Sequence, residues 1–253
     1  MNLVYVDDQD DYKPTVEQAC RILREWLDDE VSLVFVQPPG DADPLYLDDE
    51  GRLIGRAAAN EIPANKDGIL RVLDLGCGTG KTAAVFLATY PRATVRAVDL
   101  FEEMLKHARA RLARFRDRVE YVQGDFRHVA LGSAYDVCAS ALAIHHLLAD
   151  EKRELFSRIY EALEPGGRFL MIDWTKFRSF DLQSLAAEVA ERHAIRSVPK
   201  AEIVRAWIEH WREKNVPETV EDLTAWLLEA GFSSAECVMR YYGIALICAE
   251  KAK

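Results

Sequence analysis

The feature that most constrains this chain is an apolar run that breaks into alternating glycines. Residues 72–75 (Val-Leu-Asp-Leu) lead directly into Gly76, Gly78 and Gly80, and the next apolar run ends at Asp99. An apolar run that meets a glycine-rich turn is typical of a buried strand that turns into a helix. Glycines let a ligand approach the backbone closely, and a carboxylate at the tip of the next strand can accept hydrogen bonds from a ribose diol. The pattern therefore predicts a nucleoside-cofactor site.

Two commoner glycine loops do not fit this stretch. The triphosphate-binding Walker A loop ends in Gly-Lys-Ser/Thr, as Gly80-Lys81-Thr82 does, but it also needs a glycine where Leu75 stands. The dinucleotide-binding pattern G-x-G-x-x-G would need its third glycine at Lys81. Lys81 and Thr82 are therefore expected to begin the helix after the glycine turn.

The order Asp74-x-Gly76-x-Gly78-x-Gly80, with an acid two residues before the first glycine, resembles motif I of the class I S-adenosylmethionine (SAM)-dependent methyltransferases. Later segments resemble the same family: Gly-Asp-Phe at 124–126, a Pro-Gly-Gly turn at 165–167 before a fifth strand, and Ala-Gly-Phe at 230–232 before two apolar runs. The resemblance covers about residues 69–250. It implies an α/β, Rossmann-like class I methyltransferase fold, with a seven-stranded, mostly parallel sheet, an antiparallel C-terminal hairpin and helices on both faces.

The resemblance also implies which residues bind SAM, whose demethylated product is S-adenosyl-L-homocysteine. Asp99 would bind the ribose diol, the glycine loop would hold the methionine end, and Asp125 and Phe126 would hold the adenine. Met104 stands where the family places an apolar residue against the adenine, although ordinary core packing explains it equally well. The complete expected cofactor set is Asp74, Gly76, Cys77, Gly78, Gly80, Asp99, Leu100, Met104, Gly124, Asp125, Phe126 and Ser140.

The chemistry expected of such a cofactor needs little from the protein beyond positioning. SAM carries its methyl group on a sulfonium, so the enzyme mainly aligns the acceptor and excludes water. A general base is needed only where the acceptor arrives protonated. His145 and His146 are candidate catalytic residues because imidazole titrates near neutral pH, and capping a helix or satisfying a carbonyl is the alternative role for one of them. Asp173 and Trp174 end the fifth strand and are expected to border the acceptor.

Three regions are expected along the chain. Residues 1–68 form an N-terminal extension and lid with a helix at 15–28, and residues 69–253 form the SAM-binding domain. An insertion at about 175–220, with helices at 182–195 and 200–214, is expected to cap the acceptor because it leaves from the carboxyl end of the fifth strand. The expected substrate pocket consists of Tyr12, His146, Trp174, Arg205 and Trp207.

Composition favours a single soluble enzyme. The chain has 253 residues, of which 49% are hydrophobic and 29% charged, and no apolar run approaches the ~20 residues of a membrane span. Five cysteines without a C-x-x-C pair suggest neither a disulfide framework nor a metal site. A net charge of −10 argues against a nucleic-acid partner. We therefore expect a cytoplasmic enzyme that acts on a small-molecule acceptor, as a monomer or a homodimer.

Three other functions compete with methyl transfer to a small molecule. Carboxy-SAM synthase, which uses the SAM sulfonium without transferring the methyl, has a similar layout and would need an arginine in the insertion, for which Arg205 and Arg212 compete. A non-catalytic SAM-binding regulator would usually have lost the glycines or the ribose acid, which this chain keeps. Base-amino methylation of nucleic acid is disfavoured because residues 140–143 (Ser-Ala-Leu-Ala) lack the Asn/Asp-Pro-Pro-aromatic motif.

Overall fold

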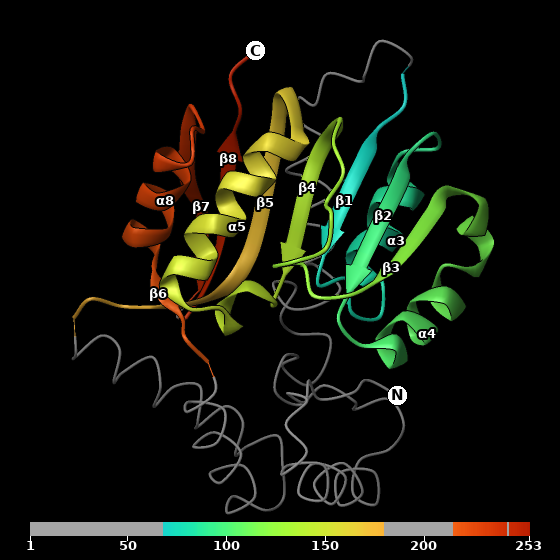
Figure 1. The fold of residues 1–253 in the computed structure, drawn as a ribbon, viewed down its shortest axis with the longest axis horizontal. Coiled ribbons are helices and arrows are strands. Elements are labelled where there is room, and N and C mark those ends of the chain that lie inside the picture. The colour runs from blue at the N-terminus through green and yellow to red at the C-terminus, as the bar shows by residue number, and fades with distance from the viewer. Residues whose placement is uncertain (1–67, 180–214, 242) are drawn as a thin grey trace, which may run out of the picture. The chain divides into compact units, whose positions relative to one another are not determined.

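The computed structural model describes residues 68–179, 215–241 and 243–253, which form an α/β unit built on one sheet (Figure 1). Seven strands follow one another across the sheet in the order β3-β2-β1-β4-β5-β8-β7, and the short strand β6 (Glu218–Thr219) pairs with β5 beside that path. All described residues belong to the compact unit of Asp48–Ala186 and Lys214–Lys253. The predicted Rossmann-like sheet is confirmed, whereas the helices expected at 15–28, 182–195 and 200–214 lie outside the described residues.

Five parallel strands make up the N-terminal part of the sheet. They are β1 (Arg71–Leu75), β2 (Thr94–Asp99), β3 (Val119–Gln123), β4 (Tyr135–Ala141) and β5 (Leu163–Lys176). The chain passes from β1 to β2 and β3 in one direction and then crosses to β4, which pairs with the other side of β1 (Figure 1). In open parallel sheets, ligands bind outside the carboxyl ends of the strands at such a reversal. The topology therefore places a ligand site where β1, β2 and β4 end.

The C-terminal strands β8 and β7 complete the sheet, and β8 runs antiparallel to the five parallel strands. Strand β8 (Ile244–Glu250) runs antiparallel to β5, and β7 (Ser234–Tyr241) runs antiparallel to β8. The predicted C-terminal hairpin is thus confirmed. The register between β7 and β8 shifts between Cys237 and Met239 at the outer edge of the sheet.

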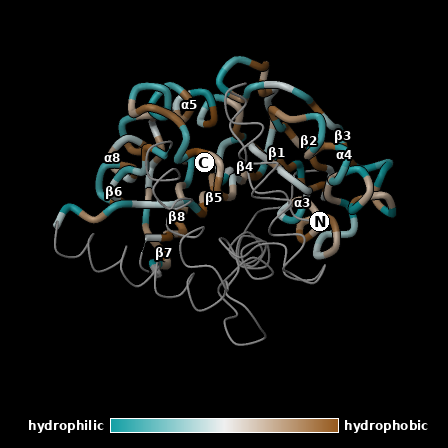
Figure 2. The backbone as a smooth tube through the Cα atoms, turned by 90° about the horizontal axis from the view of Figure 1, so that it is seen from below, coloured by the Kyte–Doolittle hydropathy of each residue, from teal (hydrophilic) through white to brown (hydrophobic). Residues whose placement is uncertain are grey.

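Helices cover both faces of the sheet, as Figures 1 and 2 show. Helices α5 (Ala149–Ala162) and α8 (Val220–Glu229) lie on one face, and α3 (Lys81–Thr89) lies on the other. Helix α8 begins where the Thr219 hydroxyl accepts a hydrogen bond from the Asp222 amide at 3.1 Å, which caps its first turn. Helix α4 (Glu102–Arg111) gives way to the 3₁₀ segment Ala113–Arg118.

The Pro-Gly-Gly segment differs from its prediction. It was expected as a turn before the fifth strand, but the strand already begins at Leu163, directly after α5. Leu163 pairs with Tyr135 and Arg168 pairs with Val137, so the residues between them bulge within one strand. Gly167 is required there, because an added Cβ would lie 2.8 Å from the Glu164 carbonyl oxygen.

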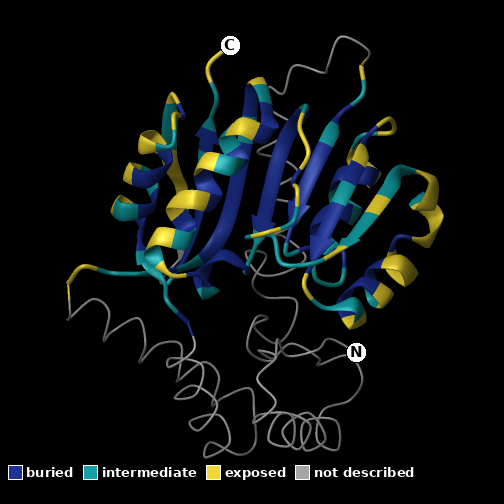
Figure 3. Cartoon of the chain, viewed as in Figure 1, coloured by how far each residue is buried: buried dark blue, intermediate teal, exposed yellow. Residues whose placement is uncertain are grey.

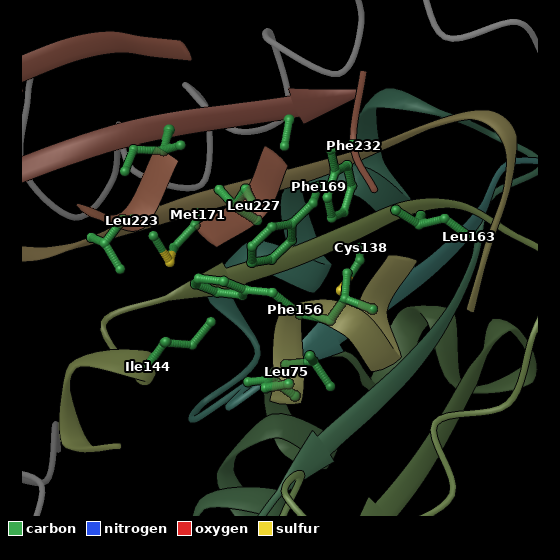
Figure 4. Packing of buried hydrophobic residues seen from close by; sticks show 14 of the residues in the cluster. Leu75, Cys138, Ile144, Phe156, Leu163, Phe169, Met171, Leu223, Leu227 and Phe232 are labelled. Atoms are coloured by element: carbon green, nitrogen blue, oxygen red, sulfur yellow. The ribbon is translucent and has the colours of Figure 1, made fainter. Parts of the chain in front are cut away.

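A large apolar cluster fills the space between the sheet and the helices α5 and α8 (Figure 4). Phe156 of α5 meets Phe169 of β5 with 5.9 Å between ring centroids, and Tyr160 meets Phe232 edge-on at 5.3 Å. Each fully buried large apolar side chain stabilises the fold by about 1.5–3 kcal/mol. The central strands are buried along their length, and exposure gathers on the outer faces of the helices (Figure 3). The loops at the carboxyl edge of the sheet therefore extend from a well-packed core.

Candidate active site

The glycine loop between β1 and α3 contains two glycines with different roles. Both Gly76 and Gly78 have left-handed backbones, with φ of +66° and +51°. A Cβ on Gly76 would lie 2.4 Å from the Cβ of Ala143, so packing within the protein requires glycine. Among the described residues, a Cβ on Gly78 would meet no atom within 4 Å. Gly78 therefore leaves a cradle that a side chain would fill, as close approach of a ligand to the backbone requires.

Asp74 is a buried acid beneath this loop. Its side chain is 1% exposed, and its Oδ2 has no hydrogen-bond partner among the described residues. Burial raises the pKa of Asp74 to about 7, the Ala83 amide opposes that rise, and the nearby Asp99 adds to it. A buried carboxylate oxygen without a partner is costly unless a donor or a cation satisfies it.

Asp99 ends β2 and is held by the backbone of the same loop. Its Oδ2 accepts a hydrogen bond from the Gly78 amide at 2.7 Å, and its Oδ1 accepts one from Phe101 at 3.0 Å. Burial raises the pKa of Asp99, although the two amides oppose this. A carboxylate has about four acceptor positions, so each oxygen keeps capacity for a further donor. The structure thus brings Asp74, Gly78 and Asp99 together, as the sequence predicts.

Asp125 follows β3 and is already engaged by a neighbouring arginine. Its Oδ1 accepts from the Arg127 amide at 2.8 Å, and its Oδ2 accepts from the Arg127 Nε at 2.8 Å and Nη2 at 2.6 Å. Arg127 also donates to Glu151 at 2.6 Å, and Glu151 accepts from the Leu148 amide at the start of α5. Burial alone would raise the pKa of Asp125, but the hydrogen bonds and the charge of Arg127 lower it.

The other expected cofactor residues lie along the same edge in mixed environments. Ser140 is fully buried and donates to the Leu75 carbonyl at 2.9 Å, so its hydroxyl ties β4 to β1. Leu100 is 40% exposed, whereas Met104 is buried in α4. The Gly124 amide donates to the Asp99 carbonyl at 2.9 Å. The remaining members, Cys77, Gly80 and Phe126, are respectively buried, buried and half-buried.

A second group of side chains lies where β4 and β5 end. Asp173 Oδ1 lies 2.5 Å from His145 Nδ1, and the side chains of these two residues are 3% and 4% exposed. Asp173 Oδ2 accepts from the amides of Ile144 and His145 at 2.8 and 3.0 Å, and Oδ1 also accepts from Trp174 at 2.8 Å. Burial alone would raise the pKa of Asp173, but the charge and hydrogen bond of His145, with the Trp174 amide, lower it.

The predicted catalytic residues therefore lie in one cluster. Both oxygens of Asp173 are engaged, by the His145 ring and by three backbone amides. His146 is half-buried, and its ring centroid lies 4.0 Å from that of His145. Trp174 is half-buried beside them. Tyr12, Arg205 and Trp207 of the expected substrate pocket lie outside the described residues.

Sequence inspection missed Arg127, Glu151 and Lys152. Lys152 is 1% exposed on the apolar stripe of α5, where it precedes Leu155 and Phe156 at helical spacing. The sequence could have indicated Lys152, because it occupies a core position of the helix, and charged side chains are almost never fully buried without partners. The Arg127–Glu151 contact could not be predicted from a local sequence pattern, because it joins a loop to a helix 24 residues away.

Two searches of the described residues returned negative results. No group of three or more His, Cys, Asp or Glu side chains in that part of the chain is arranged to hold a metal ion. None of the helices described is long and apolar enough to cross a membrane.

The fold and the glycine loop define a Rossmann-like domain for a nucleoside cofactor, and comparisons with known proteins narrow this class. Residues 72–167 match the model of a methyltransferase domain. The chain is 30% identical to a demethylmenaquinone methyltransferase of Clavibacter sepedonicus over 174 residues, which is 66% of either chain. It is 28% identical to a carboxy-S-adenosyl-L-methionine synthase of Aeromonas hydrophila over 123 residues, which spans 49% of that protein.

A solved structure has the same fold. The crystal structure of human N-acetylserotonin methyltransferase in complex with SAM matches 81% of this chain and 52% of its own, with a TM-score of 0.56 and 20% sequence identity. The chain belongs to the class I SAM-dependent methyltransferases, and SAM is the cofactor of that family. The matches to the Clavibacter and Aeromonas proteins cover about two thirds and about half of those relatives.

Proposed function

We propose that this protein transfers the methyl group of SAM to a small-molecule acceptor by in-line SN2 displacement. The observation that carries the proposal is the placement of Asp74 and Asp99 around the open cradle at Gly78. When bound, SAM supplies a methyl group on a positively charged sulfur, which is already a good leaving group. The protein's own task is to bind, to align and to exclude water.

The described residues fit the three parts of this cofactor. The unpartnered Oδ2 of Asp74 suits the ammonium group of the methionine end, because a buried carboxylate gains most from a cationic donor. The remaining acceptor capacity of Asp99 suits the ribose hydroxyls. Asp125 would accept from the adenine amino group, in an orientation that Arg127 fixes. Leu100 and Phe126 offer apolar surface for the ring.

We further propose that His145 accepts the proton of an acceptor that arrives protonated, such as a hydroxyl. Donation from Nδ1–H to Asp173 selects the tautomer in which Nε2 holds the lone pair. His145 Nε2 would then take the proton of the acceptor, while bound SAM would supply the methyl group and its own sulfur as the leaving group. The ionised Asp173 stabilises the imidazolium that results. The His145 ring and the Trp174 amide lower the pKa of Asp173 and so favour its ionised form within the fold.

The test begins with mass spectrometry of the small molecules released when freshly purified protein is denatured. SAM or S-adenosylhomocysteine is expected, and calorimetry should show that added SAM binds to stripped protein. Incubation with SAM and panels of small hydroxylated acceptors should then give S-adenosylhomocysteine together with a product heavier by one methylene unit. SAM binding without turnover of any acceptor would favour a non-catalytic regulator, and failure to bind SAM would overturn the cofactor site itself.

The same mass spectra distinguish methyl transfer from the carboxy-SAM synthase alternative. Release of a carboxylated SAM would replace methyl transfer by chemistry that keeps the methyl group on the sulfur. The arginines on which that alternative depends, Arg205 and Arg212, lie outside the described residues. A cytoplasmic location completes the proposal, because the four described cysteines, Cys77, Cys138, Cys237 and Cys248, are all free thiols, as in a reducing compartment.

A further inference from the structure

Lys152 is a buried cation that the proposed chemistry does not use. It lies in the first turn of α5, on the side that faces the core, and is 1% exposed. An ammonium group is expensive to remove from water unless its protons find strong acceptors. Its position therefore requires an explanation from the groups that surround it.

The ammonium group joins two segments that are far apart in the sequence. Its Nζ donates to the carbonyl of Leu147, directly after the two histidines, and to the carbonyl of Val216 at 2.5 Å. The Val216 amide in turn donates to the His145 carbonyl at 2.8 Å. Hydrogen bonds in both directions thus hold residue 216 against the loop of residues 144–148, which we call the histidine loop.

Residue 216 belongs to the segment 215–219, by which the chain re-enters the sheet. Strand β6 in that segment pairs in parallel with the end of β5, at Thr175 and Lys176. An ion pair of 2.7 Å between Lys176 and Glu218 supports the same contact. The re-entry segment, the last residues of β5 and the histidine loop therefore meet at one corner of the carboxyl edge.

We propose that Lys152 is a positioning residue that holds the re-entry segment 215–219 against the histidine loop and thereby fixes His145 for turnover. The inference rests on the proposed role of His145. The charged groups that act on Lys152 are Glu218, Asp173 and Glu151, which favour its protonation, and Lys176, which opposes it. Burial is the largest influence and lowers the pKa of Lys152 to about 8.

The chain offers a matched control at the other end of the same helix. Lys251 Nζ also donates to two carbonyls, those of Tyr160 and Leu163, each at 2.7 Å. Lys152→Met and Lys251→Met each remove one ammonium group and leave two carbonyls without that donor. Only the first lies beside His145, so a purely structural role for both lysines predicts similar consequences.

The experiment compares both variants of the full chain in three measurements. For Lys152→Met we expect kcat to fall about 10- to 100-fold through misplacement of the catalytic group, while the SAM dissociation constant stays within about twofold. Hydrogen exchange should accelerate in peptides that cover 144–148 and 215–219. Lys251→Met should leave kcat, and exchange in these peptides, close to the wild-type values. Equal losses in both variants, or parallel changes of kcat and SAM affinity in Lys152→Met, would overturn the proposal.

Two further outcomes stay informative. If Lys152→Met does not fold, Lys152→Gln keeps one donor for the carbonyls without the charge and should show an intermediate loss of kcat and intermediate exchange. If the wild-type protein methylates no acceptor, the proposed function fails, and hydrogen exchange alone then decides whether Lys152 holds the two segments. Unchanged exchange in the Lys152 variants would refute the clamp in that case as well.

Discussion

The two halves of the carboxyl edge are built in different ways. At the ends of β1 and β2, which we call the cofactor half, Asp99 accepts hydrogen bonds from two backbone amides, that of Gly78 in the glycine loop and that of Phe101 just after β2. At the ends of β4 and β5, partners lie far apart in sequence: Asp173 binds residues 144 and 145, and Lys152 reaches residue 216. The cofactor half therefore relies on residues close together in sequence, whereas the acceptor half, at the ends of β4 and β5, depends on side chains that meet only in the folded chain.

Removal of the Asp99 carboxylate should have the largest effect on the cofactor half. In Asp99→Ala, SAM affinity should fall by about 100-fold or more, because hydrogen bonds to a charged group contribute about 1.5–3 kcal/mol each. Calorimetric titration measures this, with circular dichroism to check the fold. Asp117→Ala, at a residue whose side chain is 91% exposed, is the control. Unchanged SAM affinity in Asp99→Ala would remove the basis of the cofactor site.

The two loop glycines should separate fold from binding. Gly76→Val and Gly78→Val share the strain of a left-handed backbone, of about 1–3 kcal/mol, so the difference between them reports the surrounding space. Gly78→Val should abolish SAM binding in a folded protein. Gly76→Val should lower the melting temperature further, because its side chain would overlap Ala143. Equal melting temperatures would contradict the different roles assigned to the two positions.

Asp173→Asn tests the acceptor half by activity and by pH. We expect kcat to fall about 100-fold or more, because the amide no longer selects the His145 tautomer or stabilises its cation. Loss of the buried carboxylate, which accepts hydrogen bonds from three backbone amides, should also destabilise the fold by about 1–3 kcal/mol at neutral pH. Because the folded pKa of Asp173 is lowered, that stabilisation is present above its unfolded value and is lost as pH falls through the folded one. Urea unfolding from pH 7 down to pH 3 should show the wild-type and variant curves converge.

Lys152 should also make stability rise with pH, but in the alkaline range and because its neutral form is favoured in the fold. Its folded pKa of about 8 lies below the unfolded value near 10.4, so the unfolded chain binds more protons between these values. Wild-type stability should therefore rise relative to Lys152→Met by about 1–3 kcal/mol from pH 8 to pH 10.5. Urea unfolding at pH 7, 8.5 and 10 measures the difference. A flat difference would mean that the ammonium group is not desolvated as its burial indicates.

The smallest effect is expected at Arg127, whose long side chain binds Asp125 in the cofactor half. Arg127→Gln should weaken SAM binding only about two- to fivefold, since partly exposed ion pairs contribute about 1 kcal/mol or less. Arg153 lies on α5, as Glu151 does, and forms an exposed ion pair with Glu229 of α8. Arg153→Gln, which breaks that pair, should leave SAM affinity unchanged. If Arg127→Gln lowered SAM affinity as much as Asp99→Ala does, both halves would depend on side chains that are far apart in sequence.

This contrast also explains what could be predicted from the sequence. The cofactor half was recognisable because Asp74, the glycines and Asp99 fall within one strand–turn–helix–strand unit, whose spacing reflects local backbone geometry. His145 and Asp173 were each identified as candidates, but their contact depends on β4 lying beside β5. Lys152 bonds to a residue beyond the insertion, so no local pattern could indicate its partner.

The two halves come close together at Gly76 and Ala143, where a Cβ on Gly76 would lie 2.4 Å from the Cβ of Ala143. Ala143 directly precedes the histidine loop, so a bulkier residue there would press on the glycine loop before it altered any acceptor contact. Changes farther along the histidine loop carry no such penalty for the cofactor. A larger side chain at position 143 is therefore expected to weaken SAM binding as well as to alter the acceptor half.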